Sequence, residues 1–352
     1  MKTAKVLMKG NEAMAEAAIR AGCRYYFGYP ITPQNEVPAY MSQRLPEVNG
    51  VFVQAESELA AINMVYGAGA CGFAAMTTSS SPGISLMQEG ISYMAGAEVP
   101  AVIANMMRGG PGLGNISPSQ ADYLQATKGG GHGDYNIIVY APSSVQNLID
   151  LTYKSFDIAF KYRVIVMILG DGILGQMSES VTLPEFKEPI KRNDGFMGHG
   201  GKQVIIRSLY LDPENQLEIH NHKLQMRYSD IKKNEVIFDT YKTDDCEYMI
   251  VAYGTVARVA RASVDLLRER GVKAGLFQPV TLWPFPSEDL FRSVKNVKKV
   301  FVAEMAVNQL EQDVRLSVGK ATDISGINKL GGAIFSEEEI ADSIIADIKN
   351  NN

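Results

Sequence analysis

The chain has 352 residues, of which 46% are hydrophobic and 21% are charged. These values are typical of globular proteins and exclude a mostly disordered chain, a coiled coil and a disulfide scaffold. At about 100–200 residues per domain, the length favours two domains. The net charge of −5 comes without a basic run, so nucleic acid is a poor partner prediction.

Strands and helices alternate through the first half of the chain. Continuous apolar strands separated by helices indicate an α/β domain with a mostly parallel sheet flanked by helices. The spacing of apolar residues predicts helices at Gly10–Ala21 and from about Ser57 to Tyr66, and strands from Arg24 to Tyr29 and at Val51–Gln54, Val99–Met107, Ile137–Tyr140 and Val164–Leu169.

The pattern changes after residue 178. Ser178–Asn215 has no sustained period and is rich in proline and glycine, so we interpret it as a linker or arm, followed by a helix at Glu214–Tyr228. A second α/β unit begins with a strand at Tyr248 and continues with a helix at Thr255–Arg270 and strands at Val272–Phe277 and Lys299–Glu304. The expected organisation is a first domain over 1–178, a linker with a helix over 179–244 and a smaller α/β domain over 245–352.

The cysteines give no sign of a metal site. Cys23, Cys71 and Cys246 are far apart in the sequence and form no C-x-x-C pair, so we expect neither an iron–sulfur cluster nor a structural zinc, and no metal site, in this chain. Met1–Lys9 is too short and too polar for a signal peptide. These features predict a reduced, cytoplasmic protein.

One long segment is almost free of charge. Between Leu59 and Ala121 the only charged residues are Glu89, Glu98 and Arg108. Its uncharged part up to residue 88 contains Gly, Ser, Thr and Asn, and so lacks the roughly 20 predominantly apolar residues of a membrane span. A charge-poor, Gly- and Ser-rich segment of this kind favours a large interface or binding site over plain core.

Two glycine motifs in the sequence are weak indicators. Gly67, Gly69 and Gly72 fit the dinucleotide pattern G-x-G-x-x-G, but they end a predicted helix instead of linking a strand to a helix, so close helix packing is the better interpretation. Gly170-Asp171-Gly172 follows an apolar strand, as in magnesium–pyrophosphate sites, but Asn193 follows too early to complete that motif. We therefore interpret Asp171 as a solvated residue in a turn at a strand end.

Glu58 is the strongest candidate for a functional residue. It begins a helix that runs into the small residues at Gly67, and it borders the charge-poor segment. The simple explanation is an acidic residue that complements the helix dipole, behind Ser57 or Glu56 as the cap. An ionised carboxylate is nevertheless costly to bury without a partner, and two Gly/Ser/Pro loops accompany it, at 28–34 and 77–83.

Together these residues resemble the pyrimidine-binding domain of thiamine-diphosphate enzymes, and among them the 2-oxoacid:ferredoxin oxidoreductases. The matching features are a Tyr-Pro-Ile-Thr-Pro loop at 29–33, Glu58 nine residues ahead of Gly67, a Ser-Ser-Ser-Pro-Gly loop at 79–83 and Arg108 at the end of the next strand. Residues 245–320 resemble the transketolase C-terminal-like domain. The likeness is strongest to the branched-chain (2-oxoisovalerate) enzymes of the four-subunit type.

The resemblance implies a role for individual residues. Glu58 would be the catalytic group, bound to N1′ of the aminopyrimidine ring, and Thr32 with Arg108 would bind the carboxylate of the substrate. The residues implied in cofactor binding are Tyr29, Pro30, Ile31, Glu58, Ser80, Ser81, Pro82 and Gly83.

The resemblance also implies a reaction and partners. The chain would be one subunit of an enzyme that decarboxylates a branched-chain 2-oxoacid to acyl-CoA, with electrons passed to an external ferredoxin. Thiamine diphosphate would be shared with a pyrophosphate-binding (beta) subunit that carries Mg²⁺, and a ferredoxin-like subunit would hold iron–sulfur clusters of the 4Fe–4S type. We expect a hetero-oligomer, or a homodimer when the chain is isolated. The alternatives are 2-oxoglutarate or pyruvate as substrate, a non-catalytic scaffold subunit, and a nicotinamide dehydrogenase resting on Gly67–Gly72.

Overall fold

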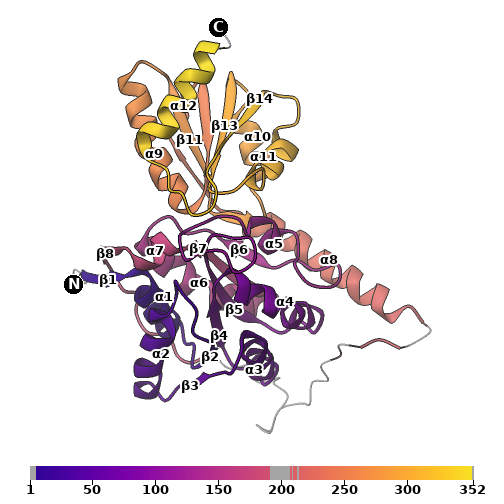
Figure 1. Cartoon of the computed structure of the whole chain (residues 1–352). Helices are drawn as coiled ribbons and strands as arrows, with labels where there is room; N and C mark the ends of the chain where they lie inside the picture. Colours follow the sequence, from indigo (N-terminus) through magenta and orange to yellow (C-terminus); the bar gives the residue numbers. More distant parts are fainter. Residues whose placement is uncertain (1–4, 191–206, 208, 212–213, 351–352) are drawn as a thin grey trace.

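The computed structural model describes residues 5–190, 207, 209–211 and 214–350, which form two α/β units (Figure 1). The first unit is built on a seven-stranded sheet with the order β12-β6-β7-β5-β4-β2-β3, parallel except for the edge strand β12. The predicted parallel sheet is therefore confirmed. Its strands are β2 (Tyr25–Gly28), β3 (Val51–Gln54), β4 (Ala75–Ser79), β5 (Ala101–Met107), β6 (Ile138–Tyr140), β7 (Ile165–Asp171) and β12 (Thr281–Trp283).

Helices cover both faces of this sheet (Figure 1). On one face lie α1 (Gly10–Arg20), α2 (Glu36–Glu47) and α6 (Val145–Tyr162); on the other lie α3 (Glu58–Ala70), α4 (Ser81–Gly96), α5 (Tyr123–Thr127) and α8 (Gln216–Asn234). A short helix, α7 (Gly172–Gln176), follows β7.

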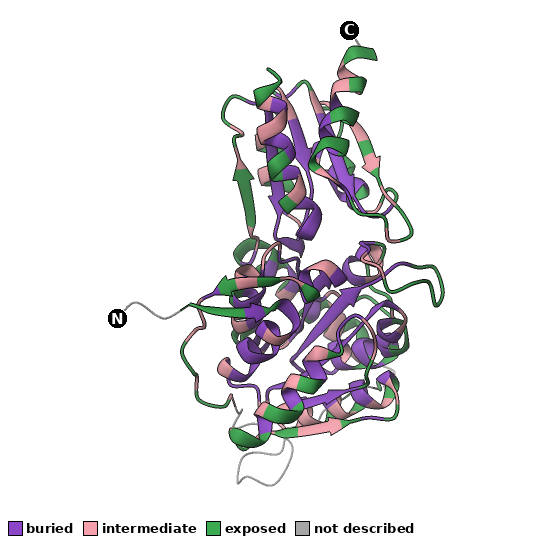
Figure 2. Ribbon diagram, turned by 60° about the vertical axis from the view of Figure 1, so that its left-hand side comes forward, coloured by how far each residue is buried: buried purple, intermediate pink, exposed green. Residues whose placement is uncertain are grey.

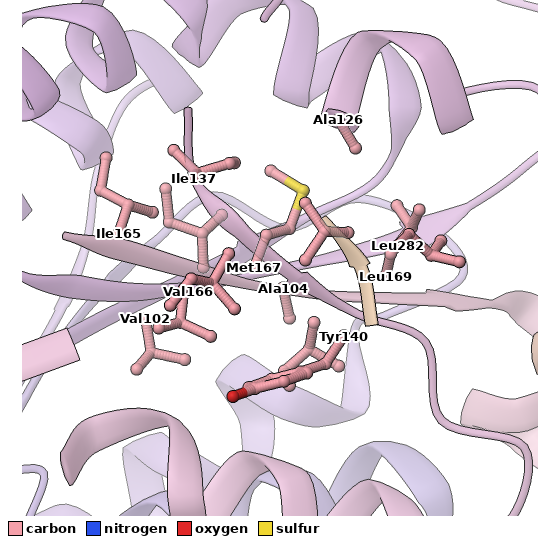
Figure 3. Close-up of a cluster of buried hydrophobic side chains, with 14 of the residues drawn as sticks. Val102, Ala104, Ala126, Ile137, Tyr140, Ile165, Val166, Met167, Leu169 and Leu282 are labelled. Atoms are coloured by element: carbon pink, nitrogen blue, oxygen red, sulfur yellow. The ribbon is translucent and has the colours of Figure 1, made fainter. Parts of the chain in front are cut away.

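The core of the first unit lies on both sides of the central strands. Every residue of β5 and β7 is buried, as expected for apolar strands covered on both faces. Figure 3 shows Ile165 and Met167 on one side of the sheet and Val166 on the other, the alternation of successive side chains in a strand. Figure 2 shows the same concentration of buried residues along the strands of both units.

The second unit has a five-stranded sheet of the order β14-β13-β10-β11-β9. Its strands are β9 (Phe238–Tyr241), β10 (Tyr248–Val251), β11 (Ala274–Pro279), β13 (Lys299–Glu304) and β14 (Asp323–Asn328), with β9 antiparallel to β11. Helices α9 (Gly254–Glu269) and α12 (Glu337–Asn350) lie on one face, and α10 (Ser287–Ser293) and α11 (Leu310–Val318) on the other (Figure 1).

The stretch expected to be a linker also contains strands. β8 (Ser178–Val181) pairs antiparallel with β1 (Val6–Lys9), and β9 belongs to the second sheet. Conversely, β12 comes from within the second unit but pairs with β6 of the first. These short strands are defined by pairing partners far away in the sequence, which periodicity within a segment cannot reveal. Asn193 and the glycine-rich stretch at 195–201 lie outside the described residues.

Within the described ranges, none of the helices combines the length and the apolar character that a membrane crossing requires.

Candidate active site

Four neighbouring strands bring the predicted residues to one edge of the first sheet. β5, β4, β2 and β3 are adjacent and parallel, so their carboxyl ends lie at the same edge, which is where ligands bind in open α/β sheets. The loop 29–34 follows β2, Glu58 follows β3, Ser80 and the first turn of α4 follow β4, and Arg108 follows β5. The segment 77–83, which the sequence predicted to be a loop, is therefore the end of β4 and the start of α4.

Glu58 is the first residue of α3, and its side chain is buried. Ser57, one of the two caps that the sequence allowed, is the N-cap, and its hydroxyl accepts a hydrogen bond from the N–H of Ala60 at 3.2 Å. Only 5% of Glu58 is exposed. A carboxylate that merely complements a helix dipole is usually solvated, so this burial requires a further explanation.

Gly83 makes room for the Glu58 side chain. A Cβ atom at this position would lie 2.5 Å from Glu58 Oε1 and would overlap the hydroxyl oxygen of Ser79. Only glycine therefore allows the first turn of α4 to pack against this carboxyl group. The structure thus joins two parts of the predicted site, the start of α3 and the start of α4.

Several polar atoms at this edge lack partners. The hydroxyls of Thr77, Ser79 and Ser80 and the Nε of Arg108 are buried and have no hydrogen-bond partner among the described residues. Buried polar atoms are nearly always paired in folded proteins, because an unpaired one is costly. The unpaired hydroxyl of Ser79 lies close to the Glu58 carboxyl group, because both contact the position that a Cβ of Gly83 would take. This pair suits a heterocycle that carries both donors and acceptors, and the aminopyrimidine of thiamine fits it.

Arg108 and Thr32 are in direct contact. The guanidinium donates from Nη1 to the main-chain oxygen of Thr32 and from Nη2 to that of Leu113, each at 3.1 Å. Arg108 is only 7% exposed, and it forms no ion pair with any residue that the structure describes. Because a guanidinium has five N–H donors and two bind main-chain oxygens, donors remain for an anion.

Tyr29, Pro30 and Ile31 lie on the loop that precedes Thr32. Tyr29 and Pro30 are exposed and Ile31 is half-buried, so this end of the loop is open to a ligand or a neighbouring chain. The buried Gln34 anchors the other end of the loop. Its N–H donates to the Ile31 oxygen at 3.1 Å, and its side chain accepts from Thr78.

Sequence reasoning did not single out Asn105 and Asp122, which complete the site. Asp122 accepts hydrogen bonds from the Ser81 hydroxyl and from the Asn105 amide, at 2.5 Å and 2.9 Å. Two signals could have identified them. Asn105 is the polar residue of an otherwise apolar strand, and Asp122 is the first charged residue after the charge-poor segment.

Asp171 differs from the prediction. It is 2% exposed, not solvated, and its Oδ1 accepts the N–H groups of Ile173 and Leu174 at 2.9 Å and 3.1 Å, which makes it the N-cap of α7. The turn after β7 is covered by neighbouring elements, so the carboxylate finds backbone donors there in place of water. Gly172 packs against Pro33, since a Cβ there would meet the proline ring at 3.2 Å.

The other glycine motif has the predicted packing role at one position. Gly69 lies in the last turn of α3, where a Cβ would be 2.6 Å from Val99 Cγ1 and 2.9 Å from the Pro100 oxygen. Gly67 has open space around it. The motif therefore ends a helix, as predicted, and does not stand between a strand and a helix.

The remaining charges of the charge-poor segment are structural. Glu98 binds Lys223 and Arg227 of α8, with Lys223 Nζ at 2.7 Å from its Oε1. Burial opposes ionisation of Glu98, but hydrogen bonds from Lys223 and Arg227 outweigh it and lower its pKa to about 2. Glu89 is exposed and accepts from the Tyr93 hydroxyl at 2.9 Å.

The three cysteines form no disulfide. Cys23 and Cys246 are buried and Cys71 is half-buried. Burial raises the pKa of the Cys23 thiol to about 12. Among the described residues, no three His, Cys, Asp or Glu side chains gather in a way that could hold a metal ion.

Two family models together match most of the chain. Residues 16–249 match the thiamine-diphosphate-binding domain of pyruvate flavodoxin/ferredoxin oxidoreductases, and residues 246–340 match core domain II of pyruvate:ferredoxin oxidoreductase.

Individual relatives match nearly the whole chain. The ketoisovalerate oxidoreductase subunit VorB of Methanothermobacter thermautotrophicus is 46% identical over 96% of both chains. The 2-oxoglutarate synthase subunit KorA of the same organism is 36% identical over 97% of this chain and 99% of that protein. A solved 2-oxoglutarate:ferredoxin oxidoreductase from Magnetococcus marinus, with 2-oxoglutarate, coenzyme A and succinyl-CoA bound, is 27% identical with a TM-score of 0.89, over 98% of this chain and 66% of that one. The chain therefore belongs to the thiamine-diphosphate-dependent 2-oxoacid:ferredoxin oxidoreductase family.

Proposed function

We propose that this chain supplies the aminopyrimidine half of a thiamine-diphosphate site in a hetero-oligomeric enzyme that oxidises a branched-chain 2-oxoacid. The products would be the corresponding acyl-CoA and carbon dioxide, with electrons passed singly to ferredoxin. The observation that carries the proposal is the buried carboxyl group of Glu58, packed on Gly83 at the sheet edge that also holds Arg108 and unpaired hydroxyls.

Glu58 would hydrogen-bond to N1′ of the aminopyrimidine ring. When bound, thiamine diphosphate supplies the carbon nucleophile and the electron sink for decarboxylation. The carboxyl group of Glu58 would hold a proton at N1′ and so favour loss of the proton that activates the cofactor. Burial of the Glu58 side chain at the start of α3 would exclude water from the hydrogen bond to N1′. Gly83 has no Cβ atom, so it leaves room for the Glu58 carboxyl group.

Arg108 and Thr32 would hold the carboxylate of the 2-oxoacid. Arg108 has donors that are free of main-chain bonds, and a planar guanidinium can bind a carboxylate through two parallel hydrogen bonds. The hydroxyl of Thr32 already accepts from Asn35 Nδ2 at 3.3 Å, which leaves its own proton available to the substrate.

Other subunits would complete the enzyme. The Mg²⁺–pyrophosphate end of the cofactor and the 4Fe–4S clusters need acidic or cysteine ligands, and the described part of this chain gathers no such set. We therefore assign them to a pyrophosphate-binding subunit and a ferredoxin-like subunit, with coenzyme A as co-substrate and ferredoxin as the external acceptor. The relatives are themselves named as subunits, which supports this division.

Sequence identity supports a branched-chain substrate. The identity is 46% to a ketoisovalerate oxidoreductase subunit and 36% to a 2-oxoglutarate synthase subunit, over similar lengths. Pyruvate lacks two methyl groups of 2-oxoisovalerate, and one methylene is worth only about 1–3 kcal/mol in a hydrophobic pocket, so we expect a preference for 2-oxoisovalerate over pyruvate and not complete exclusion of pyruvate.

The test is to co-express the chain with its neighbouring subunits and to follow reduction of a viologen dye with coenzyme A. We expect the highest kcat/KM with 2-oxoisovalerate, compared with 2-oxoglutarate and pyruvate. Glu58→Gln should remove most of the rate and leave assembly intact, whereas the matched control Glu56→Gln, at an exposed position in the same turn, should keep it. Near-normal activity of Glu58→Gln would rule out its role, and no turnover by the wild-type complex would favour a scaffold subunit.

A further inference from the structure

The hydroxyl of Ser81, at the start of α4, bonds to the carboxylate of Asp122 and to the main chain of Arg108 after β5. Its Oγ lies 2.5 Å from Asp122 Oδ2, and it accepts the main-chain N–H of Arg108 at 3.0 Å. The hydroxyl has one proton, and its alternative acceptor, the main-chain oxygen of Arg108, is farther away at 3.4 Å. Ser81 therefore donates to Asp122 and keeps a lone pair for the N–H of Arg108.

Asn105 also donates a hydrogen bond to the carboxylate of Asp122. Its Nδ2 donates to Asp122 Oδ2 at 2.9 Å, and its Oδ1 accepts the main-chain N–H of Ser81 at 3.0 Å. Asp122 thus fixes the orientation of both the hydroxyl and the amide. Through them it ties the start of α4 to the end of β5, where Arg108 begins the next loop.

Asp122 itself is held from the other side by the second α/β unit. Gln120 donates its main-chain N–H to the Met305 oxygen at 3.0 Å, and the side-chain Oε1 of Gln120 accepts the N–H of Met305 at 2.9 Å. Gln309 donates from Nε2 to the Ala121 oxygen at 2.7 Å and accepts the N–H of Leu124 through Oε1 at 3.0 Å. The residues on both sides of Asp122 are therefore fixed to loops of the second unit.

We propose that Asp122 is a positioning residue for the 2-oxoacid site and that the second unit sets the geometry of this site through it. The inference rests on the role proposed above for Arg108. A small displacement of a substrate-binding group is enough to reduce catalysis, so a carboxylate that fixes the Ser81 hydroxyl, and through it the main chain of Arg108, affects substrate binding. This gives the second unit a function in the site, although no residue of the predicted site belongs to it.

Hydrogen exchange of the full-length chain tests the proposal without any need for activity. In Asp122→Ala we expect the amides of Ser81 and Arg108 to exchange about tenfold faster, because each loses the partner that orients its acceptor. Asp122→Asn should change them less, since an amide oxygen can still accept. Gln309→Ala should act in the same direction, whereas the matched control Gln312→Ala, whose amide donates to Asn308 of its own segment at 2.8 Å, should leave these amides unchanged.

Kinetics of the assembled complex provide the second readout. We expect Asp122→Ala to raise KM for the 2-oxoacid about tenfold and to lower kcat by less than about threefold, because the contact acts on a binding group. Three outcomes would each overturn the proposal. The first is an unchanged exchange pattern in folded Asp122→Ala, and the second is an equal effect of Gln309→Ala and Gln312→Ala on the amides of Ser81 and Arg108. The third is faster exchange that is spread over the whole chain. If Asp122→Ala does not fold, the two glutamine variants make the same comparison. A wild-type complex without turnover would refute the proposed function, and the exchange data would still decide the positioning role.

Discussion

The side chain of Arg108 reaches across the sheet edge and donates to the main-chain oxygen of Thr32 at 3.1 Å, which joins two residues that are 76 positions apart in the sequence. One comes from the loop after β2 and the other follows β5, on the far side of β4. This contact places the two proposed carboxylate-binding groups beside each other before any substrate arrives.

Arg108→Lys should weaken binding of the 2-oxoacid. A lysine keeps the charge but loses the planar fork and the bonds to Thr32 and Leu113, so we expect KM for the 2-oxoacid to rise about 10- to 100-fold. Steady-state kinetics of the assembled complex measure this. The control is Arg292→Lys on α10, an exposed arginine that pairs with Glu288. An unchanged KM in Arg108→Lys would show that the substrate carboxylate binds elsewhere.

Gly83→Ala should displace Glu58. The added methyl group would overlap Ser79 and lie 2.5 Å from the carboxyl group, so either the helix or the glutamate must move. Overpacking of this kind costs about 1–3 kcal/mol, and we expect kcat to fall about 10- to 100-fold if Glu58 moves.

Gly96 on the same helix provides the control for this substitution. It ends α4, and a Cβ there would have no neighbour within 4 Å, so Gly96→Ala should be neutral or slightly stabilising. Activity and thermal unfolding of both variants, measured side by side, separate a local effect at Glu58 from a general effect on α4. Equal activities of the two variants would contradict the packing argument.

Local periodicity was sufficient to predict the parallel sheet, and the resemblance to a known family pointed to Glu58, Ser80 and Arg108, which follow parallel strands at one edge of it. The sequence was not sufficient to predict the contact between Glu58 and Gly83, since this depends on how two helices pack. Asp122 was missed for a similar reason. Its hydrogen-bond donors come from α4 and β5, and no spacing within the chain relates them to it.

The same limit applies to the fold. β12 lies between strands of the second unit in the sequence, yet it pairs with β6 of the first sheet. A short apolar run indicates a strand but not the sheet to which the strand belongs. Burial of Asp171 is another example, because only the neighbouring elements decide whether the turn after β7 is solvated.

Glu98→Gln should destabilise the chain in a pH-dependent way. The pKa of Glu98 is about 2 in the folded chain, below its ordinary value of 4.5. The ionised carboxylate therefore stabilises the fold above pH 4.5, and this contribution is lost as the pH falls towards 2. We expect the substitution to lower the free energy of unfolding by about 1–3 kcal/mol at pH 7, after allowing for solvent screening, and by clearly less at pH 3.5.

Urea unfolding of the full-length chain at the two pH values measures this difference. Glu89→Gln is the matched control, because Glu89 lies in the same charge-poor segment but is exposed and bonded to Tyr93. A pH-independent effect of Glu98→Gln, or one no larger than that of Glu89→Gln, would show that the carboxylate does not anchor α8.

Asp171→Ala should reduce stability without changing the use of Mg²⁺. The carboxylate caps α7 through the N–H groups of Ile173 and Leu174, and loss of an N-cap costs about 0.5–2 kcal/mol. Asp171→Asn should cost less, because asparagine also caps helices. The Mg²⁺ concentration for half-maximal activity should be the same in both variants and the wild type, since the side chain is buried against its own helix. A higher Mg²⁺ requirement in Asp171→Asn would instead place Gly170-Asp171-Gly172 in the pyrophosphate site and would transfer that function from the partner subunit to this chain.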